Sequence, residues 1–354
     1  MNNYFCVLPF YSVEIAHNIP NNIYCCRLPA GTDIKQVQQS IVDQQRSPHC
    51  GACWRLEDRG LISERQIHNR TFDFYLDRDL EKIEQDAIDQ LNHPQIIKVG
   101  TSNLCNGTCV TCGSDASSAW AALENKPIKY NKISTEKLEK INWANIKQLS
   151  FVGGEPLLEK FNFEILNRLV ESNNTNCFVS VVTNGSCTLT PAQFQTLSKF
   201  QNLNICLSID GVSKRFEYMR YPLSWELLCE NLEQFKKITS NISVSAMISN
   251  VNVFYYSELI EFFDNHKLNY LCKQVEQPRY FSPGNLPDEF KQQVLNNNPK
   301  YLDQVKSFLN IGTYNARLFD KCCEEIQRQD ALKNINIVDY MSTNFLQKSS
   351  IEVG

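Results

Sequence analysis

The chain has 354 residues, of which 42% are hydrophobic and 21% are charged, and its formal net charge is -4. This length and composition are those of a folded protein with one large core and room for a smaller module. No basic stripe is present, which argues against a nucleic-acid partner, and no apolar stretch reaches the roughly 18 residues of a membrane helix. The first residues lack the basic start and cleavage site of a signal peptide, so we expect a cytoplasmic protein with no membrane partner.

Fifteen cysteines need a chemical explanation, because the cytosol keeps thiols reduced. An odd count in a protein that is not secreted points to metal or cluster ligation for some of them and to burial for the rest. Five of the cysteines fall within residues 1–60, which we expect to form a small domain. Alternation from Phe10 to Ile15, the turn residues HNIPNN and the returning IYCC segment predict a β-hairpin there.

Two cysteines of this domain, Cys50 and Cys53, form a CxxC pair, a two-thiolate grip used by zinc, iron–sulfur and redox sites. The hairpin would bring Cys25 and Cys26 back toward Cys6. Neighbouring side chains of a strand point to opposite faces, so only one of Cys25 and Cys26 should join the others. The domain therefore offers four ligands, enough to saturate a cluster. A zinc knuckle that only folds the segment is the alternative.

A charged, helix-like segment at residues 61–93 comes next and is expected to form a helical linker. Its apolar residues recur at Leu80, Ile83, Ala87 and Leu91, with charged residues between them. This spacing is typical of a connecting helix with one apolar face.

A strand–helix alternation begins near Ile96, which is the pattern expected of a parallel sheet. Six predicted strands lie within residues 94–280, in the segments IIKVGTS, IKQLSFV, CFVSVVTNG, LNICLSIDG, NISVSAMISN and LNYLCKQVE. Six β/α steps fall short of the eight of a closed barrel, so the predicted α/β fold is a partial, open (β/α)6 barrel. Residues 281–354 contain helix-like pieces without a clear site and are expected to form a C-terminal helical extension.

Three cysteines follow the first of these strands at spacings i, i+4 and i+7, namely Cys105, Cys109 and Cys112. Their loop is short enough to wrap a cubane iron–sulfur cluster, which cysteine thiolates hold. Four ligands would saturate a 4Fe–4S cluster, whereas three leave one iron open to a small chelating ligand and hence to chemistry. A zinc site completed by a histidine or a fourth cysteine is the alternative interpretation of the spacing alone.

The next strand–helix loop carries Gly153-Gly154-Glu155-Pro156, at the end of a strand where barrels of this kind place active sites. Two glycines allow the backbone to approach a ligand closely, and Glu155 could hold either the turn or the ligand. A lone GGEP is usually just a turn. Its place one β/α unit after CxxxCxxC makes it a more specific signal for a cofactor site.

CxxxCxxC followed by GGEP, then by TNG at 183–185 and SIDG at 208–211, resembles the radical S-adenosylmethionine superfamily over residues 94–280. The resemblance implies that the three thiolates hold a 4Fe–4S cluster whose open iron binds the amino and carboxylate groups of S-adenosylmethionine. One electron then cleaves the sulfonium, giving methionine and a 5′-deoxyadenosyl radical that abstracts hydrogen from a substrate. The implied cofactor contacts are Gly153, Gly154 and Glu155 at the methionyl amino group, Thr183 and Asn184 near the ribose, and Ser208 and Asp210 near the carboxylate or the substrate.

The N-terminal cysteines resemble a twitch domain, the shortened cysteine-rich auxiliary domain of many members of this superfamily. The segment after them is similar to that of members carrying this domain N-terminally, at Trp54, Glu57, Gly60, Ser63, Arg65 and Asn69. The resemblance implies a second, auxiliary 4Fe–4S cluster. A fully liganded cluster cannot bind substrate through an open iron, so its implied task is electron transfer.

The resemblance implies an enzyme that modifies a peptide or protein side chain, because auxiliary cysteine-rich domains often accompany peptide maturation in this superfamily. Radical oxidation of a small molecule such as a sugar or cyclitol is the first alternative. A non-catalytic iron–sulfur or zinc protein is the second. Besides the substrate, the expected partner is an external one-electron reductant such as flavodoxin or ferredoxin.

Overall fold

The fold is built on one parallel sheet of seven strands. The computed structural model describes residues 4–16, 28, 32–73, 94–100, 102–128, 138–139, 141–310 and 314–342. The strands stand in chain order, and every pairing between neighbours is parallel. Their bounds are β1 Ser12–Ala16, β2 Ile96–Gly100, β3 Gln148–Phe151, β4 Phe178–Thr183, β5 Asn202–Ser208, β6 Ile242–Ile248 and β7 Asn269–Gln274. The predicted α/β class is confirmed, and β2 to β7 are the six strands that the sequence predicts.

Strand β1 is the seventh strand, and its place corrects the sequence prediction. The alternating segment that starts at Phe10 predicts the first arm of a hairpin. The structure instead pairs β1 in parallel with β2, and Phe10 belongs to the short helix α1 (Leu8–Tyr11). The returning segment, residues 23–26, lies outside the described residues. Alternation identifies a strand but does not name its partner, and here the partner lies about eighty residues further along the chain.

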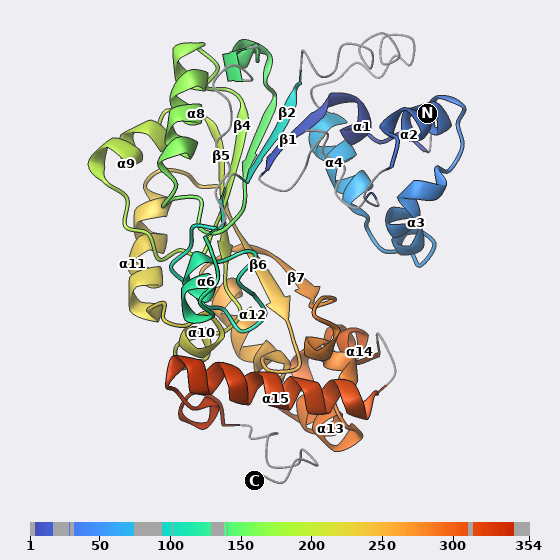
Figure 1. The fold of residues 1–354 in the computed structure, drawn as a ribbon, viewed down its shortest axis with the longest axis vertical. Coiled ribbons are helices and arrows are strands. Elements are labelled where there is room, and N and C mark those ends of the chain that lie inside the picture. Colours follow the sequence, from blue (N-terminus) through green and yellow to red (C-terminus); the bar gives the residue numbers. More distant parts are fainter. Residues whose placement is uncertain are drawn as a thin grey trace.

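Helices carry the predicted apolar stripes onto the sheet. Figure 1 shows α8, α9 and α11 along one side of it. The helices after β2 are α6 Ser118–Leu123, α8 Lys160–Glu171, α9 Pro191–Leu197, α10 Lys214–Met219, α11 Trp225–Lys236, α12 Tyr256–Asn265, α13 Asp288–Asn297, α14 Leu302–Asn310 and α15 Ala316–Lys333. Helix α8 buries Ile165, Leu166 and Leu169, as the spacing of these residues predicts. The predicted capping box of Thr190 and Gln193 begins α9.

The two faces of the sheet differ in polarity. The residues of β4 alternate between buried and half-buried positions, as those of β5 and β6 do. Half-buried polar side chains are linked from strand to strand on the second face: Asn204 Nδ2 donates to Ser180 Oγ at 3.3 Å, and Ser243 Oγ donates to Asn204 Oδ1 at 3.0 Å. One face is therefore the hydrophobic core, and the other can meet a polar ligand.

The N-terminal residues form a helical module beside β1 and β2, seen in blue in Figure 1. Its further helices are α2 Ile34–Val42, α3 Gly51–Glu57 and α4 Glu64–Asp73, and a small core of its own includes Phe5, Val37 and Ile41. Helix α4 lies within the predicted linker, whose apolar positions from Leu80 to Leu91 are outside the described residues. Among the described helices, none has the length and apolar character needed to cross a membrane.

The module contacts both edges of the sheet. It supplies β1 to one edge, and Glu64 of α4 forms an ion pair with Lys273 of β7 at the other edge, with Nζ and Oε1 3.0 Å apart. The cysteine-rich module is thereby fixed relative to the strand ends that carry the predicted site.

Candidate active site

The loop that carries Cys105, Cys109 and Cys112 is held on one side by helix α6. The Cys105 N–H donates to Ser118 Oγ, and Ser118 Oγ donates to the Cys105 carbonyl, both at 3.0 Å. Trp120 donates its indole N–H to the Cys109 carbonyl, also at 3.0 Å. These bonds satisfy backbone groups that an irregular loop would otherwise leave unpaired. They fix the positions from which the cysteine side chains project.

The end of α10 and the residues just after it hold the same loop on its other side. The Val110 N–H donates to the Met219 carbonyl at 2.8 Å, and the Thr108 N–H donates to the Tyr221 carbonyl at 2.5 Å. The backbone between the first and third cysteines is therefore fixed from two directions. Positions that are over a hundred residues apart in the sequence build one site.

The three thiols lie close enough to influence one another's ionisation. The pKa of Cys109 is raised to about 12, mainly by burial and also by the neighbouring Cys112 and Cys105, while the Arg220 guanidinium opposes the rise. Burial is also the largest cause of the raised pKa values of Cys105 and Cys112. Without a cluster these groups are thiols, so cluster binding must displace their protons.

The donor set fits an iron–sulfur cluster. Within the described part of the chain, no three His, Cys, Asp or Glu side chains gather tightly enough to surround a single metal ion. A cubane presents its iron atoms at separate corners, so three ligands need not converge on one point. Three thiols on one loop, within electrostatic reach of one another, are donors of the kind that hold such a cluster.

The glycine turn packs directly against the cysteine loop. The Glu155 N–H donates to the Leu104 carbonyl at 2.6 Å, and the Gly154 N–H donates to the Ser102 carbonyl at 3.3 Å. A Cβ on Gly154 would lie 2.2 Å from the Leu104 carbonyl oxygen. Gly153 has φ +119°, a conformation that favours glycine. The sequence predicts glycines here for the approach of a ligand, and the structure adds the approach of the chain's own backbone.

Glu155 is a buried carboxylate that ties this turn to the end of β4. It accepts hydrogen bonds from the Leu157 N–H at 3.0 Å, from Thr183 Oγ1 at 2.7 Å and from the Asn184 N–H at 2.7 Å. Burial raises the pKa of Glu155, and the three donors partly offset that rise. Of the two predicted roles, holding the turn is the one that these contacts show.

Replacing Glu155 with Gln tests this role. The amide places a donor where the structure has only donors, so we expect a loss of about 1–3 kcal/mol in the free energy of unfolding. Urea unfolding followed by circular dichroism measures it. Glu171→Gln, at the exposed end of α8, is the matched control and should change stability little. Equal stability of both variants would contradict a tying role for Glu155.

Asn184 links the end of β4 to the cysteine loop. Its Nδ2 donates to Asn106 Oδ1 at 2.9 Å and lies 4.0 Å from Cys105 Sγ. Thr183, predicted near the ribose, donates to Glu155 and accepts from the Gly185 N–H at 3.1 Å. Asn184 thus lies beside the cysteine loop, whereas Thr183 contacts the glycine turn through Glu155.

Asp210 forms a buried ion pair with Arg220. Arg220 Nη2 lies 2.7 Å from Asp210 Oδ2, and the Met247 N–H donates to Asp210 Oδ1 at 2.7 Å. Arg220 Nη1 reaches Cys109 Sγ at 3.9 Å. This is a buried ion pair rather than the surface pair that an isolated Arg most often forms. Ser208, the other predicted residue here, ends β5 opposite Ser245 of β6.

Arg220 also retains an unused donor. Its Nε is buried and has no hydrogen-bond partner among the described residues. A buried donor of this kind is costly unless a ligand or water meets it. No spacing motif marks position 220, so only the folded chain shows that the guanidinium lies at the cysteine loop.

Three of the five N-terminal cysteines line one cavity. Cys6, Cys50 and Cys53 contribute to its wall together with His49 and Arg65. Burial, followed by the neighbouring Cys53, raises the pKa of Cys50. Cys25 and Cys26 lie outside the described residues. Cys6 and the CxxC pair thus line the same cavity, and a cluster held by them stays a prediction.

The segment around Cys6 is pinned by residues of α3 and α4. Arg65 Nη1 donates to the Phe5 carbonyl at 2.6 Å, and its Nη2 forms an ion pair with Glu57 at 2.6 Å. Asn69 accepts from the Val7 N–H at 3.0 Å and donates to the Phe5 carbonyl at 2.7 Å. These contacts give Glu57, Arg65 and Asn69 a shared task, which is to hold both peptide groups that flank Cys6.

Comparisons with known proteins match the part of the chain that carries the central site. Residues 99–264 match the model of the Radical SAM superfamily. An uncharacterised protein of Methanocaldococcus jannaschii is 23% identical over 182 residues, which cover 49% of this chain and 59% of that protein. The chain thus matches less than two thirds of that relative's length.

Two solved structures have weaker likenesses. One, anSMEcpe with bound AdoMet, has a TM-score of 0.45 and 20% identity and covers 66% of this chain and 63% of that chain. The other, Streptococcus suis SuiB bound to S-adenosylmethionine, has a TM-score of 0.44 and 16% identity and covers 82% of this chain and 68% of that chain. Such likenesses assign no substrate. The match over residues 99–264, which spans both the cysteine loop and the glycine turn, supports the placement of this part of the chain in the radical SAM superfamily.

Proposed function

We propose that this chain is a radical S-adenosylmethionine enzyme whose cluster is held by Cys105, Cys109 and Cys112. The observation that carries the proposal is the packing of the pinned three-cysteine loop against the Gly153–Glu155 turn, inside the segment that matches the superfamily. When bound, the 4Fe–4S cluster would supply the electron that cleaves S-adenosylmethionine to methionine and a 5′-deoxyadenosyl radical.

The residues around the loop divide the work of binding. Glu155 uses both carboxylate oxygens within the protein, so we assign it to shaping the turn whose Gly153 and Gly154 backbone would meet the methionyl amino group. Asn184, with Thr183 behind it, lies at the loop on the side proposed for the ribose. These assignments follow from how each group is already bonded.

The carboxylate of S-adenosylmethionine needs a cation rather than Asp210. Two carboxylates repel each other, and Asp210 is already paired with Arg220. The unused Arg220 Nε is a charge-compatible donor for a carboxylate. We therefore assign carboxylate binding to Arg220, with Asp210 orienting the guanidinium and Ser208 close to the substrate.

The test is a product assay on anaerobically reconstituted, reduced protein. We expect S-adenosylmethionine to yield methionine and 5′-deoxyadenosine in equal amounts. Flavodoxin or ferredoxin, as the proposed external reductant, should support the reaction in place of a chemical one. Protein that carries a cluster and forms neither product would refute the proposal.

We further propose a second 4Fe–4S cluster in the N-terminal module, held by Cys6, Cys50, Cys53 and one of Cys25 and Cys26. The shared cavity and the pinned backbone around Cys6 support it. An auxiliary cluster of this kind favours a peptide or protein side chain as substrate, with the cluster accepting an electron during the modification.

The double variant Cys50→Ala/Cys53→Ala tests the second cluster. It should contain about four irons per chain where the unaltered protein contains about eight, because each cluster holds four. Iron and zinc are both measured by elemental analysis. About four irons together with one zinc in the unaltered protein would instead identify a zinc knuckle.

A further inference from the structure

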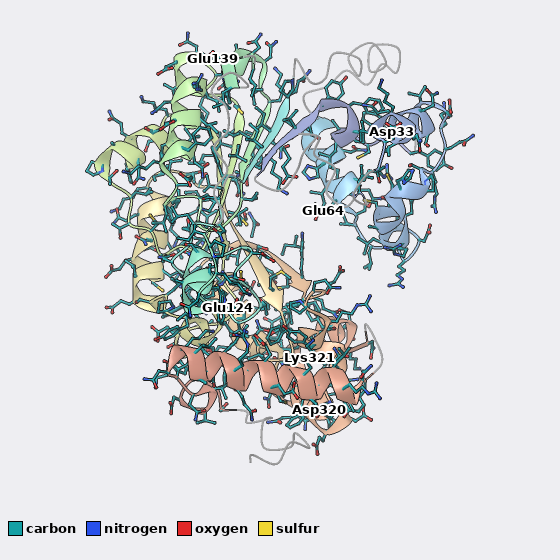
Figure 2. The ribbon with its side chains drawn as sticks, viewed as in Figure 1. Asp33, Glu64, Glu124, Glu139, Asp320 and Lys321 are labelled. Atoms are coloured by element: carbon teal, nitrogen blue, oxygen red, sulfur yellow. The ribbon has the colours of Figure 1, made fainter. Side chains whose placement is uncertain are left out.

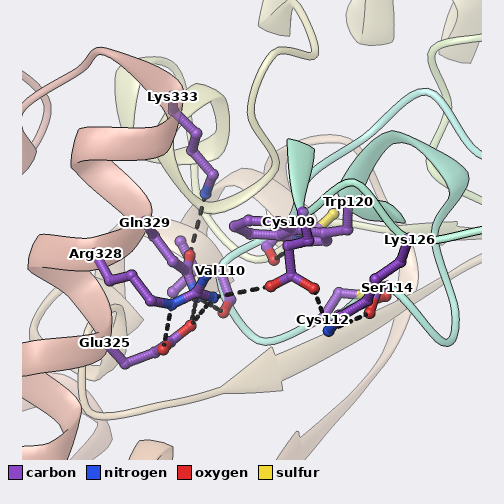
Figure 3. Close-up of polar contacts among 12 residues, drawn as sticks. Cys109, Val110, Cys112, Ser114, Trp120, Lys126, Glu325, Arg328, Gln329 and Lys333 are labelled. Carbon is purple, nitrogen blue, oxygen red and sulfur yellow. Dashed lines mark hydrogen bonds and ion pairs between the residues drawn. The ribbon is translucent and has the colours of Figure 1, made fainter. Parts of the chain in front are cut away.

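Helix α15 reaches the cysteine loop from the far end of the chain. Gln329 Nε2 donates to the Val110 carbonyl at 2.9 Å, and Val110 lies between Cys109 and Cys112 (Figure 3). The Gln329 amide is itself fixed, because its Oε1 accepts from Lys333 Nζ at 3.1 Å. The peptide between two proposed cluster ligands is thus bonded to a helix that the sequence leaves without a role.

Lys333 places a buried cation beside the same loop. Its side chain is only 6% exposed, and Nζ lies 4.7 Å from the centre of the Trp120 ring. Trp120 in turn donates its indole N–H to the Cys109 carbonyl. Lysine is almost never fully buried unless its ammonium group is paired with another group. Figure 3 shows the Lys333 side chain running from α15 toward Gln329, on the side where the Trp120 ring lies.

The charge of Lys333 survives its burial. Burial lowers the pKa of Lys333 to about 8, and the neighbouring Cys109 and Asp330 oppose that fall. At neutral pH the ammonium is therefore still the major form. The ring face of Trp120 contributes a cation–π attraction that partly replaces lost hydration.

Other contacts fix the position of α15 relative to the cysteine loop. Asp330 accepts from Tyr218 Oη at 2.9 Å, and Tyr218 precedes the Met219 carbonyl that receives the Val110 N–H. Arg328 forms an ion pair with Glu124, just after α6, with Nη2 and Oε1 3.1 Å apart. The helix is therefore tied to both elements that pin the cysteine loop.

We propose that Lys333 raises the reduction potential of the cluster held by Cys105, Cys109 and Cys112, and that Gln329 is the positioning residue that fixes the loop under it. The proposal rests on the proposed function. Reduction adds one electron from the external reductant to the cluster and needs no proton. A nearby buried cation stabilises the added negative charge, because Coulomb interactions are strong away from water. The arrangement eases delivery of the electron that the chemistry requires.

The test compares charge removal at two positions of one helix. Lys333→Gln removes the buried charge, Lys333→Arg keeps it, and Lys321→Gln removes an exposed charge about 18 Å away along α15. Figure 2 shows Lys321 toward the other end of the helix. The readout is a redox titration followed by electron paramagnetic resonance, using the signal that S-adenosylmethionine perturbs.

We expect Lys333→Gln to lower the equilibrium constant for one-electron reduction about three- to tenfold. Tenfold corresponds to about 59 mV for one electron. Lys333→Arg and Lys321→Gln should stay within about twofold of the unaltered protein. Lys333→Met is the second neutral variant, and its reduction potential should match that of Lys333→Gln. A second neutral variant keeps the test valid if one of the two binds iron poorly.

The outcomes separate this inference from the proposed function. If the unaltered protein carries the cluster and cleaves S-adenosylmethionine, but neither neutral variant shifts the potential more than Lys321→Gln does, the role of Lys333 is refuted. If the unaltered protein shows no signal that responds to S-adenosylmethionine, the proposed function fails instead. A shift in both neutral variants with recovery in Lys333→Arg supports the inference.

Discussion

Cys109→Ala is expected to abolish S-adenosylmethionine cleavage and to lower the iron content by about four atoms per chain. Cys109 is the middle ligand of the proposed three, and its thiol lies within the influence of both others and of Arg220. The two remaining thiolates would bind only two of the four irons, where the three cysteines bind three. Iron analysis and chromatography of 5′-deoxyadenosine measure the two effects.

Cys177→Ala is the matched control for this variant. Cys177 is a buried residue close to the start of β4, and its pKa, like that of Cys109, is raised to about 12 by burial. It should keep the full iron content and full cleavage. Retained cleavage in Cys109→Ala, or an equal loss in Cys177→Ala, would contradict a ligand role for the loop cysteine.

Gly154→Ala is expected to reduce cleavage by about a hundredfold, the cost that a misplacement of about 1 Å can have for a reaction. The new Cβ would lie 2.2 Å from the Leu104 carbonyl oxygen and 2.7 Å from the Asn103 carbonyl carbon. Both are backbone atoms, so the turn or the segment leading into Cys105 has to move. Initial rates of 5′-deoxyadenosine formation at saturating S-adenosylmethionine provide the measurement.

Gly113→Ala provides the control within the same loop. A Cβ at Gly113 would meet no heavy atom within 4 Å, and its backbone does not need a glycine conformation. Cleavage in Gly113→Ala should stay within about twofold of the unaltered protein, because the added methyl group enters open space. Equal cleavage rates in Gly154→Ala and Gly113→Ala would show that cleavage does not depend on the close approach of the turn to the loop.

The strand–helix alternation was readable from the sequence because it depends on local patterns. Short apolar runs separated by amphipathic helices predict parallel strands. The capping box from Thr190 to Gln193 predicts the start of a helix from four residues alone. The partner of β1 could not be read in this way. A single alternating strand is compatible with a hairpin or a distant partner, and the choice depends on packing across the whole module.

The site was predictable where residues cluster in sequence and not where the fold assembles it. The spacing of CxxxCxxC and GGEP makes both motifs recognisable in the sequence, and the structure places them in backbone contact. Arg220, Gln329 and Lys333 belong to no motif and reach the loop only through the packing of α10 and α15. Glu155 shows a further limit of prediction from sequence. A glutamate at this position is compatible with binding a ligand or with holding the turn, and the three hydrogen bonds that its carboxylate accepts favour the turn.

The most direct test of the central claim is the paramagnetic resonance spectrum of the reduced Cys50→Ala/Cys53→Ala variant, before and after addition of S-adenosylmethionine. This variant should retain only the cluster of the central loop. We predict one cluster signal that shifts on addition, because the ligand enters the coordination of an iron that the three cysteines leave open. A signal that does not respond to S-adenosylmethionine, or no cluster signal at all, would contradict the claim.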